Sequence, residues 1–254
     1  MKRPLLLLVF LLAGCASHPG ITAKNPAGCI SDEIVQIGTF GALLAGALEG
    51  TVSYGEIRQF GNFGVGTFNG LDGEMLADRG HFVQIRADGR AYPVADSQRT
   101  PFATVKCFQP DLTAELGAQP DWQEFQKALD ALIPAPNLPV AVRIRGRFRY
   151  VKARSVARKL KPYPPLTEII RTQPEFEHRD AEGLMAGFWF PSYLSGINLP
   201  GWHLHFLNSE EAEGGHVLEA VPLAVTVEID TASGLRVLFP SSGEFHEVIL
   251  GEER

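Results

Sequence analysis

The sequence has few cysteines and few histidines, no excess of basic residues and no internal repeat. There are three cysteines and seven histidines in 254 residues. The formal net charge of −6 argues against a nucleic-acid-binding protein, because neutralising phosphates requires a basic face. Charged residues make up 20% of the chain and hydrophobic residues 45%, which is typical of a globular protein with a real core and not of a disordered or fibrous chain. The length fits one large domain or two small ones.

The chain also lacks a hydrophobic run long enough to cross a bilayer. Its apolar stretch, Leu5–Leu12, follows a basic start and precedes small residues, which is typical of a secretory signal peptide. The letters "LAGC" resemble the lipobox of bacterial lipoproteins and predict cleavage before a lipidated Cys15; an ordinary signal peptide cut a few residues later is the alternative. We therefore expect an exported protein, either periplasmic or anchored to a membrane through Cys15.

On this interpretation residues 1–14 are the signal peptide and residues 15–27 a linker rich in small and polar residues. Cys29 and Cys107 are then the remaining cysteines. An exported compartment allows a disulfide between them, and two buried free thiols are the alternative. The sequence does not decide between the two.

The pattern along the chain predicts an α+β protein that is rich in strands. The clearest helix is "DWQEFQKALDALI", residues 121–133, and "PLTEIIRTQ" is a shorter candidate. Asp88-Gly89 predicts a hairpin between two strands. We expect an N-terminal β-rich subdomain at 28–164 and a C-terminal β subdomain at 165–254, although the boundary near Pro164 is weakly marked.

The segment "VRIRGRFRYVKAR" alternates as a strand does, with apolar residues on one face and four arginines, Arg143 to Arg149, on the other. The simplest interpretation of these arginines is a solvated strand face. If the alternation continues without a bulge, Arg154 falls on the apolar face, where a cation needs an anion or a polar cavity.

Three of the seven histidines lie in "GWHLHFLNSEEAEGGHV". His203 and His205 share one face of a strand, while Trp202, Leu204 and Phe206 occupy the face better suited to a core. The polar loop that follows is long enough to return His216 on a neighbouring strand. The spacing predicts a metal site; the alternative is a set of three unrelated exposed histidines.

Three neutral imidazoles leave the charge of a divalent ion uncompensated and leave coordination positions open. Such sites are usually catalytic, whereas structural zinc sites are normally closed by four protein ligands. Zn²⁺ is the first expectation from the ligand type, although other first-row ions also accept imidazole.

The segments "GWHLHFLN…GGHVLE", "GTFNGLDGEM", "TPFATVKCF" and "YVKARSV…KPYPPL" together resemble α-acetolactate decarboxylase, from about Cys29 to Phe239. The resemblance implies two mixed β-sheet subdomains with few helices, a metal site between them, and a homodimer. It implies a zinc enzyme that converts α-acetolactate to acetoin and CO₂ without an organic cofactor.

By the same resemblance, His203, His205 and His216 match the zinc ligands. Glu74 matches a carboxylate beside the metal, Arg154 an active-site arginine and Thr67 a residue of the substrate pocket. A catalytic glutamate near the C-terminus matches Glu252 best, with Glu253 an equal rival; solvated terminal charges are the alternative.

The chemistry of a β-keto acid with a tertiary hydroxyl explains this set of residues. Loss of CO₂ leaves an electron pair that moves onto the ketone oxygen, and a divalent ion stabilises the resulting enediolate. Arg154 pairs with the departing carboxylate, or helps to deliver a proton. Two other functions fit the same residues: an exported metal-binding lipoprotein without turnover, and a zinc-dependent hydrolase with Glu74 as base.

Overall fold

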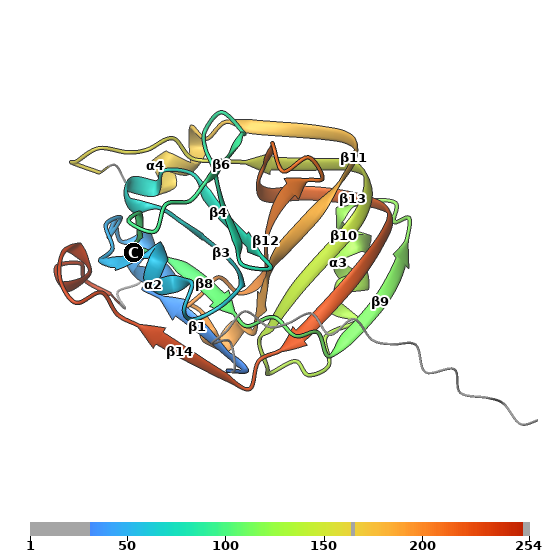
Figure 1. Cartoon of the computed structure of the whole chain (residues 1–254), viewed down its shortest axis with the longest axis horizontal. Helices are drawn as coiled ribbons and strands as arrows, with labels where there is room; N and C mark the ends of the chain where they lie inside the picture. The colour runs from blue at the N-terminus through green and yellow to red at the C-terminus, as the bar shows by residue number, and fades with distance from the viewer. Residues whose placement is uncertain (1–30, 164–165, 251–254) are drawn as a thin grey trace, which may run out of the picture.

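The computed structural model describes residues 31–163 and 166–250, and the chain within these ranges is organised around two large β-sheets (Figure 1). The first sheet has seven strands in the order β14-β1-β8-β3-β4-β5-β6. The strands are β1 (Glu33–Ile37), β3 (Phe63–Thr67), β4 (Glu74–Asp78), β5 (His81–Ile85), β6 (Ala91–Pro93), β8 (Ala103–Lys106) and β14 (Gly234–Leu238). The sheet is mixed, because β14 pairs parallel with β1 and the other pairings are antiparallel.

The second sheet is antiparallel and curls back on itself. Its strands are β9 (Leu112–Gly117), β10 (Val140–Arg154), β11 (Glu175–Phe190), β12 (Gly201–Asn208) and β13 (Gly214–Thr231). Because β10 pairs with both β11 and β13, strands β10 to β13 close into a small barrel. A further pair, β2 (Val52–Ser53) and β7 (Arg99–Thr100), stands apart from both sheets.

Few helices are present among the described residues, as the sequence predicted. They are α1 (Phe40–Leu44), α2 (Tyr54–Ile57), α3 (Trp122–Asp130) and α4 (Leu166–Arg171), with short 3₁₀ turns η1 (Asn69–Leu71), η2 (Ser192–Leu194) and η3 (Glu244–His246). The predicted helix at 121–133 is α3, and Asp121 is its N-cap, accepting a hydrogen bond from the Glu124 N–H. None of these helices is both long and apolar enough to cross a membrane.

The described residues form four buried hydrophobic clusters, and two of them involve the second sheet. One fills the closed barrel, where Phe125 and Leu129 of α3 pack against inward residues such as Leu204 and Phe206. The other lies between the two sheets and joins residues such as Phe63 and Leu76 to Phe188 and Leu207. The sequence expectation that Leu204 and Phe206 face a core is confirmed. His203 and His205 therefore face the opposite way, toward the first sheet.

The division of the chain differs from the expected boundary near residue 164. Strands β9 and β10 precede that point but belong to the second sheet, while β14 follows it and completes the first sheet. The chain therefore crosses between the sheets more than once, which an isolated Pro-rich stretch does not indicate.

The hairpin that the sequence predicted is present. The Asp88-Gly89 turn joins β5 and β6, with Gly89 at φ 77° as the turn requires. Cys107 is disulfide-bonded, which excludes a free thiol at this position, while Cys15 and Cys29 lie outside the described residues. The signal-peptide and lipobox segments also lie outside them.

Candidate metal centre

The three histidines converge between the sheets. Strand pairing places His205 of β12 directly opposite His216 of β13. The Nε2 atoms of His203 and His205 are 3.2 Å apart, and one ring nitrogen from each of the three histidines lies within 4.8 Å of the others. His205 is fully buried, and His203 is nearly so. The predicted cluster is therefore present as a set of three convergent donors.

The geometry around His205 fixes the form in which its ring is present. Its Nδ1 lies 2.7 Å from the backbone oxygen of Met75 on β4, so Nδ1 carries the proton and donates it to that carbonyl. The lone pair of Nε2 is then left facing the cluster. A backbone acceptor of this kind is a common orienting partner of a metal-binding histidine.

The electrostatics keep all three rings neutral. Burial, helped by the nearby Arg154 cation, lowers the pKa of His203 to about 4. Burial and the other histidines hold the pKa values of His205 and His216 well below the usual range. Neutral imidazole is the metal-binding form, so the donor set fits a divalent first-row ion.

Glu74 is the carboxylate of the site. It is the first residue of β4, nearly buried, and its Oε2 lies 3.5 Å from Nε2 of His205. Burial raises its pKa to about 7, although Arg154 acts in the opposite direction. Taken alone, the sequence around Glu74 indicates only a turn, and burial against the second sheet is what makes this carboxylate part of the site.

Thr67 is the strand partner of Glu74 across β3 and β4. Its hydroxyl donates to the Gly73 carbonyl at 2.7 Å, and its own carbonyl accepts from the hydroxyls of Tyr54 and Thr100, both at 2.6 Å. Tyr54 and Thr100 are fully buried and were not singled out from the sequence. They hold the Thr67 peptide, and with it the start of β4.

Arg154 lies on the opposite face of its strand from the one that regular alternation predicts. Strand β10 has register shifts between Arg147 and Tyr150, after which Val151 and Ala153 take the buried face. Arg154 is therefore on the side of Arg143 and faces the first sheet, opposite His216 on β13. Its Nε is buried and has no hydrogen-bond partner among the described residues. Arg145 also has a buried Nε without a partner, but its Nη2 donates to Asp78, whereas the Arg154 side chain makes no hydrogen bond or ion pair with the described residues. A guanidinium without such a partner is available to a ligand.

Gly215 is a further site residue that the sequence reasoning noted only as part of a loop. It has φ 152°, and a Cβ at this position would lie 2.5 Å from the Arg154 carbonyl oxygen. Only glycine allows β10 and β13 to approach so closely. Gly215 thereby sets the separation between Arg154 and His216.

The expected C-terminal catalytic residue, Glu252, lies outside the described residues, as does Glu253. The expected site residues that are described, by contrast, come together: His203, His205, His216, Glu74, Arg154 and Thr67.

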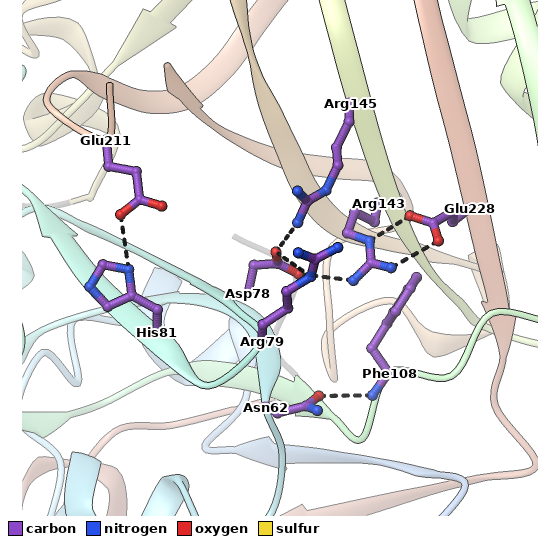
Figure 2. Close-up of polar contacts among 9 residues, drawn as sticks. All are labelled: Asn62, Asp78, Arg79, His81, Phe108, Arg143, Arg145, Glu211 and Glu228. Carbon is purple, nitrogen blue, oxygen red and sulfur yellow. Dashed lines mark hydrogen bonds and ion pairs between the residues drawn. The ribbon is translucent and has the colours of Figure 1, made fainter. Parts of the chain in front are cut away.

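A second group of charges lies between the same sheets and is built differently. Figure 2 shows Arg143 between two carboxylates, with both its Nε and Nη2 donating to Glu228, at 2.6 and 2.8 Å, and Nη1 donating to Asp78 at 3.2 Å. Arg145 donates to Asp78 as well. The expectation of a solvated strand face is wrong for Arg143, whose side chain is only 11% exposed, and holds in part for Arg145, at 37%. Arg147 and Arg149 are exposed, as expected.

A hollow of about 380 Å³ opens beside this group, lined among others by Leu76, Asp78, Arg145 and Leu207. None of the three histidines lines it. The hollow and the metal centre are therefore separate features of the space between the sheets.

The comparisons with known proteins agree with this geometry. The family model described as alpha-acetolactate decarboxylase matches residues 34–252. An alpha-acetolactate decarboxylase of Methylococcus capsulatus is 44% identical over 230 residues, covering 91% of this chain and 88% of that protein. The Bacillus subtilis enzyme of the same name is 38% identical over 213 residues, 84% of each chain. The crystal structure of alpha-acetolactate decarboxylase from Bacillus subtilis superposes with a TM-score of 0.85 at 37% identity, covering 87% of this chain and 94% of that one.

A two-sheet fold with three convergent histidines, together with these relatives, defines the class of the protein as a carboxy-lyase. Within that class, the chain belongs to the alpha-acetolactate decarboxylase family.

Proposed function

We propose that this chain decarboxylates α-acetolactate to acetoin and CO₂, using one Zn²⁺ ion held by His203, His205 and His216. The observation that carries the proposal is the convergence of three neutral histidines, one buried carboxylate and one guanidinium whose buried Nε has no partner among the described residues, in a chain of this family. Imidazole donors also suit other first-row ions, and zinc is the expectation from three-histidine catalytic sites.

When bound, Zn²⁺ supplies a Lewis acid that stabilises negative charge on the substrate oxygens as CO₂ leaves. The histidines contribute by staying neutral, which their lowered pKa values ensure. The hydrogen bond from His205 to Met75 keeps that ring in one tautomer and one orientation.

Arg154 pairs with the substrate carboxylate and holds it in place until the carbon–carbon bond breaks. Its guanidinium has a buried donor without a partner in the part of the chain that the structure describes, and a planar fork of donors matches a carboxylate. Because a guanidinium is a poor acid, we assign Arg154 this binding role and not the delivery of the proton.

Glu74 takes the proton of the tertiary hydroxyl. A carboxyl group whose pKa lies at about 7 is able to accept and return a proton near neutral pH. The electrons of the broken bond pass to the ketone oxygen and give an enediolate. Glu74 returns its proton to the carbon, and a proton from water restores the hydroxyl group, which gives acetoin. Glu252 remains a second candidate for this proton transfer.

The test is acetoin formation from racemic acetolactate, with zinc content measured on the same samples, for the wild type, His205→Ala and His178→Ala. His178 is a largely buried histidine of the same sheet outside the cluster, so it controls for the loss of a ring. We expect about one zinc per chain and turnover in the wild type and His178→Ala, and neither in His205→Ala. If the wild type bound zinc but formed no acetoin, the function as a metal-binding lipoprotein would be supported instead. If it hydrolysed esters and formed no acetoin, the function as a zinc-dependent hydrolase would be supported. The comparisons favour neither alternative.

We also propose that the chain is exported and anchored through a lipidated Cys15, and that it forms a homodimer. The signal-like start and the lipobox support the first proposal, and the family resemblance supports the second. Incorporation of labelled palmitate that disappears in Cys15→Ala tests the anchor, and the mass of the protein in solution tests the dimer.

A further inference from the structure

Glu244 of η3, near the end of the described residues, connects this segment to residues 48 and 49 and to Lys161. Its Oε2 accepts hydrogen bonds from the backbone N–H groups of Leu48 and Glu49, at 2.9 and 3.1 Å. Its Oε1 lies 2.6 Å from Nζ of Lys161. The Glu244 side chain is 17% exposed, so these contacts are more sheltered than an ordinary surface ion pair.

The first branch of this network leads to Thr67 and Glu74. The carbonyl of Leu48 accepts a hydrogen bond from the Gly70 N–H at 2.8 Å. Gly50 and Asn69 are joined in both directions, at 2.9 and 3.0 Å. Asn69 and Gly70 belong to the turn between the end of β3 and the start of β4. Glu244 therefore orders residues 48 and 49, and this segment in turn is hydrogen-bonded to the turn between Thr67 and Glu74.

The second branch leads to Arg154. The carbonyl of Gly70 accepts a hydrogen bond from the Lys159 N–H at 2.7 Å. Lys159 and Lys161 lie in the segment that directly follows Arg154 at the end of β10. In the same segment Tyr163 donates to the carboxylate of Glu49 at 2.5 Å. Glu244 thus joins, on the same side of the site, the segments that lead to Glu74 and to Arg154.

We propose that Glu244 is a positioning residue that fixes the Glu74 turn relative to the Arg154 segment. This inference rests on the proposed function. The positioning depends mainly on Oε2 of Glu244, because this oxygen accepts the two backbone N–H groups. These hydrogen bonds order residues 48 and 49, and through them Gly70. The ion pair with Lys161 adds less, because Lys161 is exposed.

Three variants separate these contributions. Glu244→Ala removes the acceptor, Glu244→Gln keeps one oxygen that is able to accept both N–H groups, and Lys161→Met removes the ion pair alone. Glu124→Gln is the matched control, since it breaks a carboxylate–lysine contact of similar length on α3, outside the network. For each zinc-loaded protein we would measure kcat, KM, zinc content and Tm.

We expect Glu244→Ala to lower kcat about tenfold or more at full zinc content, at temperatures where the protein remains folded, because small misplacements of reacting groups are costly. Glu244→Gln should recover most of that loss, and Lys161→Met and Glu124→Gln should stay near wild type. Unchanged kcat in Glu244→Ala, or a loss that only follows zinc content or folded fraction, overturns the proposal. An equal loss of kcat in Glu244→Gln and Glu244→Ala would also overturn the proposal.

Amide hydrogen exchange on the metal-free proteins gives a readout that needs no turnover. The amides of Leu48, Glu49, Gly70 and Lys159 should exchange faster in Glu244→Ala than in wild type, and unchanged exchange would contradict the network. If the wild type forms no acetoin, the proposed function fails, and this exchange measurement still decides whether Glu244 holds these segments.

Discussion

Strands β4 and β10 carry charged residues into the space between the sheets at two places, and the two groups differ in how their charges are matched. At one place Arg143 and Arg145 meet Asp78 and Glu228, and Arg143 has protein partners for all three of its nitrogens. At the other, Glu74 and Arg154 lie beside three neutral histidines, and the Nε of Arg154 has no hydrogen-bond partner among the described residues.

The difference explains why one group is structural and the other is a site. Both Arg143 and Arg145 contact a carboxylate, although the Nε of Arg145 has no partner among the described residues, and Arg143 holds the pKa of Glu228 below its usual range. Around the histidines, burial raises the pKa of Glu74 and lowers those of the rings, so the protein holds these groups in unfavourable surroundings that a cation and an anionic substrate would relieve. Charged side chains that have partners within the protein stabilise the fold, whereas charged side chains without such partners are available to bind a ligand.

The largest effect should come from removing the Arg154 cation. Arg154→Met should lower kcat/KM about 10³-fold, equivalent to about 4 kcal/mol, because the substrate carboxylate loses its partner. Zinc content should be unchanged, since Arg154 is not a ligand. Arg147→Met, an exposed arginine of the same strand, is the control. If Arg154→Met retained turnover, the contrast between a structural charge group at Arg143 and a catalytic one at Arg154 would be wrong.

Breaking the matched group should instead reduce stability. In Arg143→Met, Asp78 and Glu228 lose a partner whose side chain is only 11% exposed, and the free energy of unfolding should fall by about 3 kcal/mol. Denaturant unfolding measures this change, with Arg149→Met, exposed on the same strand, as control. Zinc content and kcat should be retained. A variant that is as stable as wild type but inactive would show that this group belongs to the site.

The metal-free protein should be less stable at pH 5.5 than at pH 7.5. The three histidines have lowered pKa values in the folded state, so the unfolded chain binds their protons first as the pH falls. Glu74 opposes this, because its raised pKa makes the folded state bind its proton first. Three groups outweigh one, and the net loss is about 2 kcal/mol.

Chelator-treated protein unfolded by denaturant at several pH values measures this dependence. The same titration of His205→Ala should show a smaller loss, since one of the three rings is absent. A free energy of unfolding that rises on acidification would show that the rings are not held neutral.

The sequence alone predicts the parts of this site that depend on strand periodicity. Residues two apart on a strand share a face, so His203 and His205 were expected to project together and Leu204 and Phe206 to face a core. Both expectations are confirmed. The positions of Glu74 and Arg143 could not be obtained in this way, because both depend on the second sheet covering the first.

Arg154 shows a different limit. Periodicity places it on the apolar face only if β10 is regular, and the register shifts near Phe148 reverse that assignment. The arginine is nevertheless at the site, because the face that the shifts give it is the one that meets the first sheet. The structure places Arg154 opposite His216, whereas the argument from alternation placed it on the apolar face.

The pairing of β14 with β1 has a consequence for how the molecule is made. The first described strand, beginning at Glu33, is hydrogen-bonded along its length to a strand that begins at Gly234. A contact between positions so far apart in sequence forms late, because a long loop must close before it contributes. The seven-stranded sheet therefore stays incomplete until almost the whole chain is available.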